Sequence, residues 1–272
     1  MKSLRDRYLS PQRITGIIRR NCILFCKDYM EILMYPKFGA HEPGKKLTSE
    51  IIPVVEGIQH LDEALEEKKG AILLHLHFGA MQLVLPAIAH RGYPLAQVGQ
   101  SRLALLQNLG KAGSNLFAQT QHKRKQFEES LPAKFFYIGK SVREIIRWLS
   151  DNKIVDIAAD GRNGNRWIMT DFLGRKAYFP DGPFRLSNLT GAAILPTFII
   201  RQQDNTHKII IEKSINTEGE LDGLKSNSPE MLLKRFLNLA EDYVKMYPCH
   251  FCTRLWVMHQ EAPKLHHPLF LE

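Results

Sequence analysis

The sequence contains no uninterrupted apolar run of membrane-spanning length. Its longest stretch without Asp, Glu, Lys or Arg runs from Gly70 to His90, which is about as long as a transmembrane helix. Three polar side chains interrupt this stretch, His75, His77 and Gln82, and polar groups are costly in hydrocarbon. We therefore expect a buried strand followed by a partly buried helix rather than a membrane span.

A secretory leader is not apparent either. The segment from Met1 to Arg20 is basic and has no apolar core before a small-residue cleavage site. We therefore expect the protein to stay in the cytosol or on the membrane that faces it. The chain has 272 residues, of which 44% are hydrophobic and 24% charged, and it has no internal repeat. This is the composition of an ordinary globular protein.

Acidic residues are in deficit, with 28 Asp and Glu against 37 Lys and Arg, which gives a net charge of +9. Such an excess favours an anionic partner, which would be nucleic acid, acidic lipid headgroups or a phosphate-bearing substrate. Scatter of Lys and Arg over a solvated surface explains part of the excess. No helix-turn-helix, zinc-finger or RNA-binding signature is present, so we expect no nucleic-acid partner.

Cysteine is scarce, and its four copies form two close pairs, Cys22 with Cys26 and Cys249 with Cys252. The second pair has the spacing of zinc ligands, and the first pair would supply two more thiolates. The first pair, however, lies among apolar residues of a predicted helix, where cysteine behaves as a small hydrophobe. We favour this second interpretation and predict no metal site.

Residues 11 to 38 are predicted to form an amphipathic helix or helix pair. Apolar residues recur there at helical spacing, and basic side chains such as Arg19 and Arg20 occupy the rest of the surface. A basic amphipathic segment is typical of binding to an anionic membrane surface, and the alternative is a helix that simply caps the core. We assign residues 1–45 to this N-terminal helical segment.

The chain then alternates between strands and helices. A buried strand over 71–77, a helix over 80–91 and a second strand over 94–99 predict a βαβ unit with parallel strands. Two later segments, 193–201 and 208–213, are predicted to be paired strands joined by a polar turn.

The strand over 71–77 ends on a histidine, and Phe78-Gly79 breaks the run before the helix begins. Histidine exchanges a proton near neutral pH, which makes it the usual general base. His77 and Gln82 are too far apart to be neighbours on one helix face, so His77 must lie in the loop before the helix. Gln82 would then orient the imidazole. We expect His75, on the apolar strand, to be a satisfied core residue.

His77-Phe78-Gly79-x-x-Gln82 resembles the His-x4-Asp/Glu motif of glycerolipid-type acyltransferases, above all that of the lipid A biosynthesis (lauroyl/myristoyl) acyltransferases. The chain departs from that motif because Gln82 stands where the family has a carboxylate. Glutamine accepts a hydrogen bond from an imidazole but does not stabilise the imidazolium, so weaker catalysis is expected. The competing interpretation is a catalytically weakened or inactive member of the family that binds acyl chains or lipids.

Two further stretches carry the resemblance. A buried strand runs into Asp160-Gly161-Arg162, similar to the family's strand that ends in an Asp and Gly loop. The stretch from Gly182 to Pro196 is similar to the family's Gly-x-x-x-Leu-Ala-x-x-Thr-Gly-Ala-x-x-Val-Pro. We interpret it as structural, apart from Gly182-Pro183, which would place the N-terminus of a helix at the site. Asp160 would restore the missing negative charge if it lies near His77. The alternative is that Asp160 and Gly161 form an ordinary turn.

The resemblance implies an α/β fold, a single layered domain over residues 46–272 with a mostly parallel central sheet flanked by helices and an active site at the strand ends. It also implies transfer of a fatty acyl group from an acyl carrier protein or coenzyme A thioester to a hydroxyl or amine of a lipid or glycolipid. This would occur at the cytoplasmic face of the inner (plasma) membrane, with a peripheral enzyme that needs no cofactor or metal.

The same resemblance implies roles for individual residues. His77, Gln82 and Asp160 are the expected catalytic residues, with His77 as general base, and backbone amides near Gly79 or a nearby cation would stabilise the oxyanion. Basic side chains would hold a phosphate of the acceptor or of the donor's pantetheine arm, and the candidates are Arg162, Arg166, Arg175, Lys123 and Arg124. For the cluster at Lys123 and Arg124 the alternative is a solvated face.

Overall fold

A computed structural model describes residues 11–34, 53–99, 122, 125–126, 128–138, 142–216 and 227–271. In this part of the chain, a seven-stranded sheet has the order β1-β9-β8-β2-β5-β3-β4, and a separate hairpin contains β6 and β7. The strands are β1 (Val54–Glu56), β2 (Ala71–His75), β3 (Leu95–Gly99), β4 (Lys134–Tyr137), β5 (Ile154–Ala158), β6 (Trp167–Phe172), β7 (Arg175–Pro180), β8 (Ala193–Arg201) and β9 (His207–Ile211).

The large sheet is parallel at every pairing except the one between β8 and β9. β2 lies in its centre, between β5 and β8, and all five residues of β2 are buried. A strand covered on both faces needs apolar residues at every position, which explains the continuous run at the start of the histidine motif. The predicted parallel sheet and the antiparallel pair at 193–213 are both confirmed.

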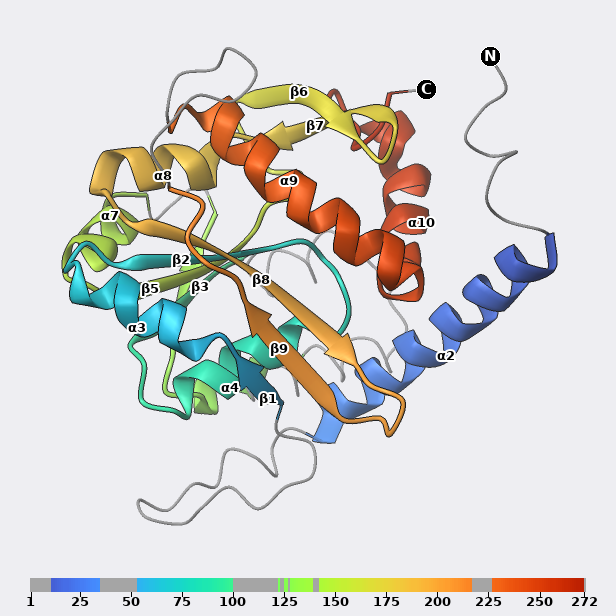
Figure 1. Cartoon of the computed structure of the whole chain (residues 1–272), viewed down its shortest axis with the longest axis horizontal. Coiled ribbons are helices and arrows are strands. Elements are labelled where there is room, and N and C mark those ends of the chain that lie inside the picture. The colour runs from blue at the N-terminus through green and yellow to red at the C-terminus, as the bar shows by residue number, and fades with distance from the viewer. Residues whose placement is uncertain are drawn as a thin grey trace.

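Helices cover both faces of this sheet (Figure 1). Side chains of β2 alternate between two core clusters, with Ile72 and Leu74 in one and Ala71 and Leu73 in the other. The first cluster includes residues of α7 (Val142–Ser150), α8 (Gly182–Thr190) and α9 (Pro229–Met246), and the second includes residues of α3 (Ile58–Glu66) and α4 (Val84–Ala89). The fold is therefore a three-layer α/β/α domain, as expected.

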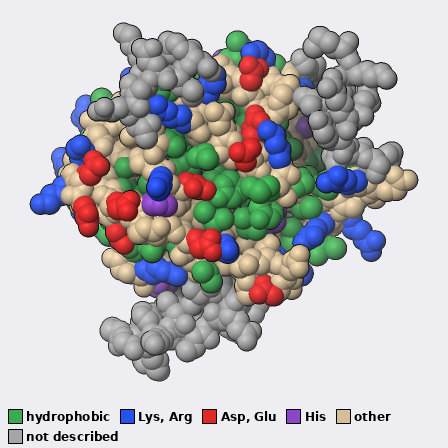
Figure 2. Space-filling model, in the orientation of Figure 1, with side chains coloured by type: hydrophobic (Ala, Val, Ile, Leu, Met, Phe, Trp, Pro, Cys, Tyr) green, Lys and Arg blue, Asp and Glu red, His purple; other side chains and the backbone are tan. Residues whose placement is uncertain are grey.

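The remaining helical elements lie outside these two layers or join them. They are α2 (Pro11–Met34) and α10 (Cys252–Glu261), with the short 3-10 helices η2 (Met81–Leu83), η4 (Pro248–His250) and η5 (Ala262–Lys264). None of the described helices is both long enough and apolar enough to cross a bilayer. Figure 2 shows charged side chains of both signs around the edge of one face and hydrophobic side chains gathered near its middle.

Two predictions need adjustment or stay open. The helix expected over 80–91 begins as the 3-10 turn η2 and becomes α-helical only at Val84. The N-terminal helix is present as α2, but residues 1–10 and 35–52 lie outside the described residues, so the boundary at residue 45 stays a prediction.

Candidate active site

His77 lies in the loop that follows β2, at the edge where the parallel strands β2 and β5 end. The loop turns sharply because the amide of Phe78 donates to the carbonyl of Leu76 at 2.7 Å, and Gly79 then adopts a positive φ of 60°. A left-handed backbone of this kind favours glycine. The chain therefore leaves the strand abruptly, as the sequence predicts, and the side chain of His77 stays 40% exposed.

Asp160 follows β5 directly and is the partner of His77. One carboxylate oxygen, Oδ1, accepts hydrogen bonds from Nδ1 of His77 at 2.7 Å and from its backbone amide at 3.1 Å. The carboxylate is fully buried, whereas the imidazole is accessible. A neutral His77 that donates its Nδ1 proton to Asp160 has a lone pair on Nε2, so this nitrogen is the one that can accept a proton from a substrate.

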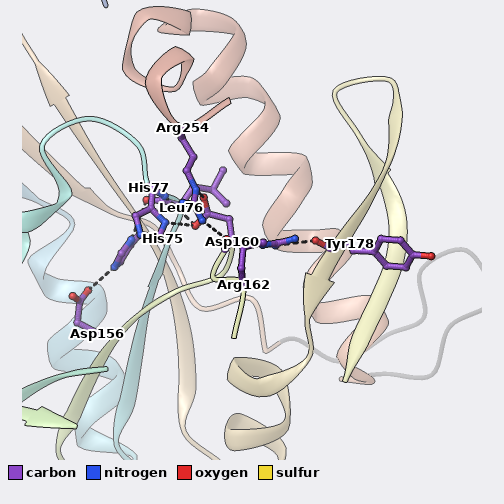
Figure 3. A network of polar contacts seen from close by, with 8 residues as sticks. All are labelled: His75, Leu76, His77, Asp156, Asp160, Arg162, Tyr178 and Arg254. Atoms are coloured by element: carbon purple, nitrogen blue, oxygen red, sulfur yellow. Dashed lines mark hydrogen bonds and ion pairs between the residues drawn. The ribbon is translucent and has the colours of Figure 1, made fainter. Parts of the chain in front are cut away.

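Arg254, near the start of α10, holds the other side of Asp160 (Figure 3). Its Nε lies 2.8 Å from Oδ2 of Asp160, and its terminal nitrogen donates to the Asp160 carbonyl at 2.5 Å. Burial by itself would raise the pKa of Asp160, but His77 and Arg254 hold the pKa of this carboxyl well below its usual range. The carboxylate therefore stays ionised at neutral pH. Sequence reasoning missed Arg254, which is 94 residues away and belongs to no recognised motif.

His250 supports the histidine loop from the other side. Its carbonyl accepts a hydrogen bond from the amide of Gly79 at 2.9 Å, and its ring stacks on Phe78 with 5.3 Å between centroids. Burial lowers the pKa of His250 to about 4, so the ring is neutral, and its Nε2 accepts a hydrogen bond from the amide of Arg201 at 3.0 Å. The amide of Gly79 is thus already bonded, so the predicted binding of an oxyanion would fall to other amides near Gly79 or to a nearby cation, and that role stays a prediction.

A second histidine–aspartate pair lies beneath the first. His75 is 3% exposed, and its Nε2 lies 3.2 Å from Oδ1 of the fully buried Asp156, whose Oδ2 accepts from Gln97 at 3.1 Å. Nδ1 of His75 donates to the carbonyl of Leu76 at 3.0 Å. The predicted core role of His75 is confirmed, and both of its nitrogens have partners.

Gln82 lies in η2, half-buried in the wall of the cavity beside His77. The sequence predicts that Gln82 orients the imidazole, but in the structure Nδ1 of His77 is hydrogen-bonded to Asp160 instead. The physical reason is topological, because β2 and β5 are parallel neighbours whose carboxyl ends meet at the same edge of the sheet. A residue from the end of β5 therefore reaches His77 directly.

The basic residues predicted to bind phosphate lie in different places. Arg162 lines the cavity, but its guanidinium donates to the backbone carbonyls of Asp160 and Tyr178 (Figure 3) and to that of His267. It therefore braces the loop after β5. Burial lowers its pKa to about 10. Arg166 is exposed at the cavity wall and remains available to a ligand.

Arg175 differs from the prediction, because it is not among the residues that line the cavity. It lies next to the tip of the β6–β7 hairpin, where its guanidinium donates to the carbonyl of Leu271 at 2.9 Å and packs on the ring of Phe270. Lys123 and Arg124 lie outside the described residues. In the part of the chain that is described, no group of His, Cys, Asp or Glu side chains is arranged to hold a metal ion.

A cavity of about 1020 Å³ opens beside His77. Its lining is mixed. Apolar side chains of the sheet and of α7 and α8 contribute to it, including Val98, Phe136, Ile145, Ile157 and Leu186. Polar and basic side chains contribute as well, including Arg166 and, on α8, Arg185. The volume is at the upper end of the range for small-molecule sites, and such a cavity suits a ligand with a long apolar chain and an anionic head.

Comparison with known proteins gives a consistent assignment. The model of a family described as bacterial lipid A biosynthesis acyltransferase matches residues 12–252. Two proteins named phosphatidylinositol mannoside acyltransferase, from two strains of Mycobacterium tuberculosis, are 26% and 25% identical over 158 residues. The matched stretch covers 56% of this chain and 46% of each relative, so the chain matches about half the length of these curated relatives. On the strength of the family match, which takes in β2, β5 and the loops that carry His77 and Asp160, the chain belongs to the bacterial lipid A biosynthesis acyltransferase family.

Proposed function

We propose that this protein transfers a fatty acyl group from an acyl carrier protein or coenzyme A thioester to a hydroxyl or amine of a lipid or glycolipid, with His77 as general base. The observation that carries the proposal is the ionised Asp160 hydrogen-bonded to Nδ1 of His77, beside a cavity lined by both apolar and basic side chains. Family membership supports acyl transfer as the reaction class.

The reaction would proceed by direct transfer. Nε2 of His77 takes the proton from the acceptor hydroxyl while the hydroxyl oxygen attacks the thioester carbonyl carbon. The carbon–sulfur bond of the resulting tetrahedral intermediate then breaks, the new ester remains, and the imidazolium returns the proton to the departing thiolate. Asp160 stays ionised throughout and stabilises the imidazolium, which is the role of the aspartate in a Ser-His-Asp triad. A well-placed base of this kind contributes about 10²–10⁴-fold to the rate.

The cavity suggests how the substrates are held. The acyl chain would lie against the apolar side chains that β3, β4, β5, α7 and α8 contribute to the lining. Arg166 and Arg185, both exposed in the cavity wall, would contact a phosphate of the acceptor or of the pantetheine arm. The mycobacterial relatives are named for acylation of a mannosylated phosphoinositide, a glycolipid acceptor with a phosphate, which is the same chemical class. We further propose that the protein works peripherally on the cytoplasmic face of the inner membrane, drawn there by its net charge of +9.

The test is a turnover assay with purified protein. An acyl thioester is mixed with vesicles that contain a candidate glycolipid acceptor, and free thiol and acylated lipid are measured together. His77→Ala should lower the rate by about 10²–10⁴-fold. The matched control is His259→Ala, because His259 is an exposed histidine on α10. Equal rates for His77→Ala and wild type would refute the assignment of the base.

The same assay separates this function from the alternative, which is a catalytically weakened or inactive member of the family that binds acyl chains or lipids. Its support is the replacement of the family's carboxylate by Gln82. The carboxylate of Asp160 on His77 favours the enzyme. Binding of acylated ligand by wild type without any thiol release would establish the alternative.

A further inference from the structure

A second histidine supports the turn that presents His77. The amide of Phe78 donates to the carbonyl of Leu76 at 2.7 Å, and a hydrogen bond between residues i and i+2 defines a three-residue γ-turn. The middle residue of this turn is His77. Nδ1 of His75 donates to the same Leu76 carbonyl at 3.0 Å (Figure 3). The carbonyl that closes the turn is therefore held by an imidazole as well as by the loop itself.

The hydrogen bond within the turn is a weak constraint by itself. It closes a small ring, so its N–H does not point straight at the carbonyl oxygen, and hydrogen bonds weaken as they depart from linearity. A carbonyl oxygen has two lone pairs and accepts a second donor. His75 supplies that second donor for Leu76. The side chain of His75 is 3% exposed, so this bond ties the turn to the interior of the sheet.

His75 is in turn fixed by a row of polar side chains across the sheet. Asp156 on β5 lies 3.2 Å from Nε2 of His75. Gln97 on β3, which is paired in register with Asp156, donates to the other carboxylate oxygen at 3.1 Å. The three side chains come from neighbouring strands, and a buried polar network whose members are satisfied is rigid. The imidazole that holds the Leu76 carbonyl is therefore kept in one orientation.

One peptide group joins the two histidine–aspartate pairs. The carbonyl of Leu76 and the amide of His77 belong to the same planar unit. Its carbonyl accepts from Nδ1 of His75, and its amide donates to Oδ1 of Asp160 at 3.1 Å. The same oxygen of Asp160 accepts from Nδ1 of His77 at 2.7 Å. If this peptide group rotated, the amide and the ring of His77 would therefore both move relative to Asp160.

We propose that His75 is a positioning residue for His77, because its Nδ1–H orients the Leu76–His77 peptide group and thereby sets the alignment of His77 with Asp160. The two nitrogens of His75 then have separate roles. Nε2, with Asp156, contributes to the stability of the fold, and Nδ1 aligns the candidate base. The catalytic consequence rests on the proposed acyl transfer, whereas the alignment itself stands on the hydrogen bonds alone.

Three variants separate the two nitrogens. Asp156→Asn is the reference, because it removes the buried charge and with it most of the cost of replacing His75. In this background, His75→Leu removes both nitrogens. His75→Asn has nearly the shape of leucine, but its amide nitrogen is bonded to Cγ, as Nδ1 of histidine is, and donates to the Leu76 carbonyl. The two double variants therefore differ in the proposed contact and in little else.

The kinetic readout is turnover of an acyl thioester with a glycolipid acceptor. Relative to Asp156→Asn alone, His75→Leu in that background should lower kcat about 10–100-fold with an unchanged KM for the thioester, because His77 loses its alignment. His75→Asn in the same background should restore most of this loss. Equal losses in the two double variants, or no loss in either, would overturn the proposal.

A second readout does not depend on turnover. The NMR nitrogen shifts of the His77 ring, detected through its carbon-bound protons, report which nitrogen carries the proton of the neutral ring, and the hydrogen bond to Asp160 selects Nδ1. We expect this tautomer in wild type, in Asp156→Asn and in the double variant with His75→Asn. The double variant with His75→Leu should show a mixture of tautomers. The same single tautomer in all four proteins would overturn the proposal.

The two readouts distinguish this proposal from the function on which it rests. If wild type itself releases no thiol, the proposed function fails, while the tautomer of His77 still decides whether His75 aligns it. If wild type turns over and the tautomer is the same in every variant, the proposed function stands and the positioning role is refuted. Gly191→Ala is the control for lowered stability, and it should leave kcat and the tautomer as they are in wild type.

Discussion

The buried pair of His75 and Asp156 gives the sharpest prediction about stability. Both side chains are removed from water, and their facing atoms lie 3.2 Å apart. Breaking such a pair by removing one member costs about 3–5 kcal/mol, because the remaining charge stays buried without a counter-charge. His75→Leu keeps nearly the same volume. The carbonyl of Leu76 also keeps the hydrogen bond from Phe78, so the unpaired Asp156 carboxylate accounts for most of the expected loss.

Asp156→Asn should be far milder. The amide has the shape of the carboxylate, its oxygen can still accept from Gln97, and its nitrogen can donate to Nε2 of a neutral His75. We expect a cost of about 1 kcal/mol, which is that of one weakened hydrogen bond. The double variant, His75→Leu with Asp156→Asn, should be more stable than His75→Leu alone. The expected coupling free energy is about 2–3 kcal/mol.

The pair also predicts how stability depends on pH. Burial lowers the pKa of His75, but the Asp156 carboxylate outweighs it, so the pKa in the folded protein lies above the ordinary value of 6.5. Between these two values the folded state holds more protons than the unfolded state. The contribution of the pair to the free energy of unfolding is therefore complete below pH 6.5 and is lost as the pH rises through the pKa of His75 in the folded protein. In Asp156→Asn burial, the largest single influence, is opposed only by the carbonyl of Leu76 and by Asp160, so we expect the pKa of His75 to fall and stability to rise with pH as the ring loses its proton.

Urea unfolding of wild type and the three variants, followed by tryptophan fluorescence between pH 5 and 9, measures these quantities. The difference between wild type and Asp156→Asn removes the contribution of all other titrating groups. The reasoning is refuted if His75→Leu lowers the free energy of unfolding by less than about 1 kcal/mol, because so small a loss would mean that the Asp156 carboxylate is hydrated. It is equally refuted if Asp156→Asn shows the same pH dependence as wild type.

Three further predictions concern the candidate active site. Gly79→Ala should lose activity and about 1–3 kcal/mol of stability, because its φ is +60° and a Cβ atom would lie 2.4 Å from a carbonyl oxygen of β8. Gly191→Ala is the control, because Gly191 also has a positive φ but its Cβ atom would meet only a flexible lysine side chain. This control should lose stability only. Gln82→Glu should preserve or raise kcat, and a large loss would show that the site requires a neutral group there. Arg254→Met should raise the pKa of Asp160 and move the acidic limb of the kcat/KM profile to higher pH, and an unmoved limb would contradict the assigned role of Arg254.

Much of the fold could be predicted because its signals are local. The buried run of β2, the glycine that ends α8 with a φ of 75°, and the polar turn between β8 and β9 each specify their own geometry. The order of the strands was not predictable in the same way. β1 pairs with β9, more than 150 residues later, and β2 lies between two strands that come later in the chain. Such pairings depend on which faces bury each other, and no single segment encodes them.

The same distinction explains what was predictable in the candidate site. His77 and Asp160 each end a buried strand, which is a local pattern, and parallel strand ends converge at one edge of a sheet. Arg254 and His250 reach the site from the C-terminal segment, where periodicity indicates nothing about charge partners. The motif itself was misleading about Gln82, because sequence proximity to His77 suggested a contact that the end of the neighbouring strand makes instead.

Under the proposed function, the position of Asp160 explains how this chain would keep acyl transfer although its motif has Gln82 in place of a carboxylate. An acid at position 82 would lie at the half-buried cavity wall, where water weakens its field. Asp160 is instead buried, held on one side by His77 and on the other by Arg254. A buried carboxylate with two cationic or proton-donating partners stays ionised and keeps its geometry when the base takes a proton. Because the loop that follows β5 supplies this carboxylate, we propose that a glutamine at position 82 is compatible with an active enzyme.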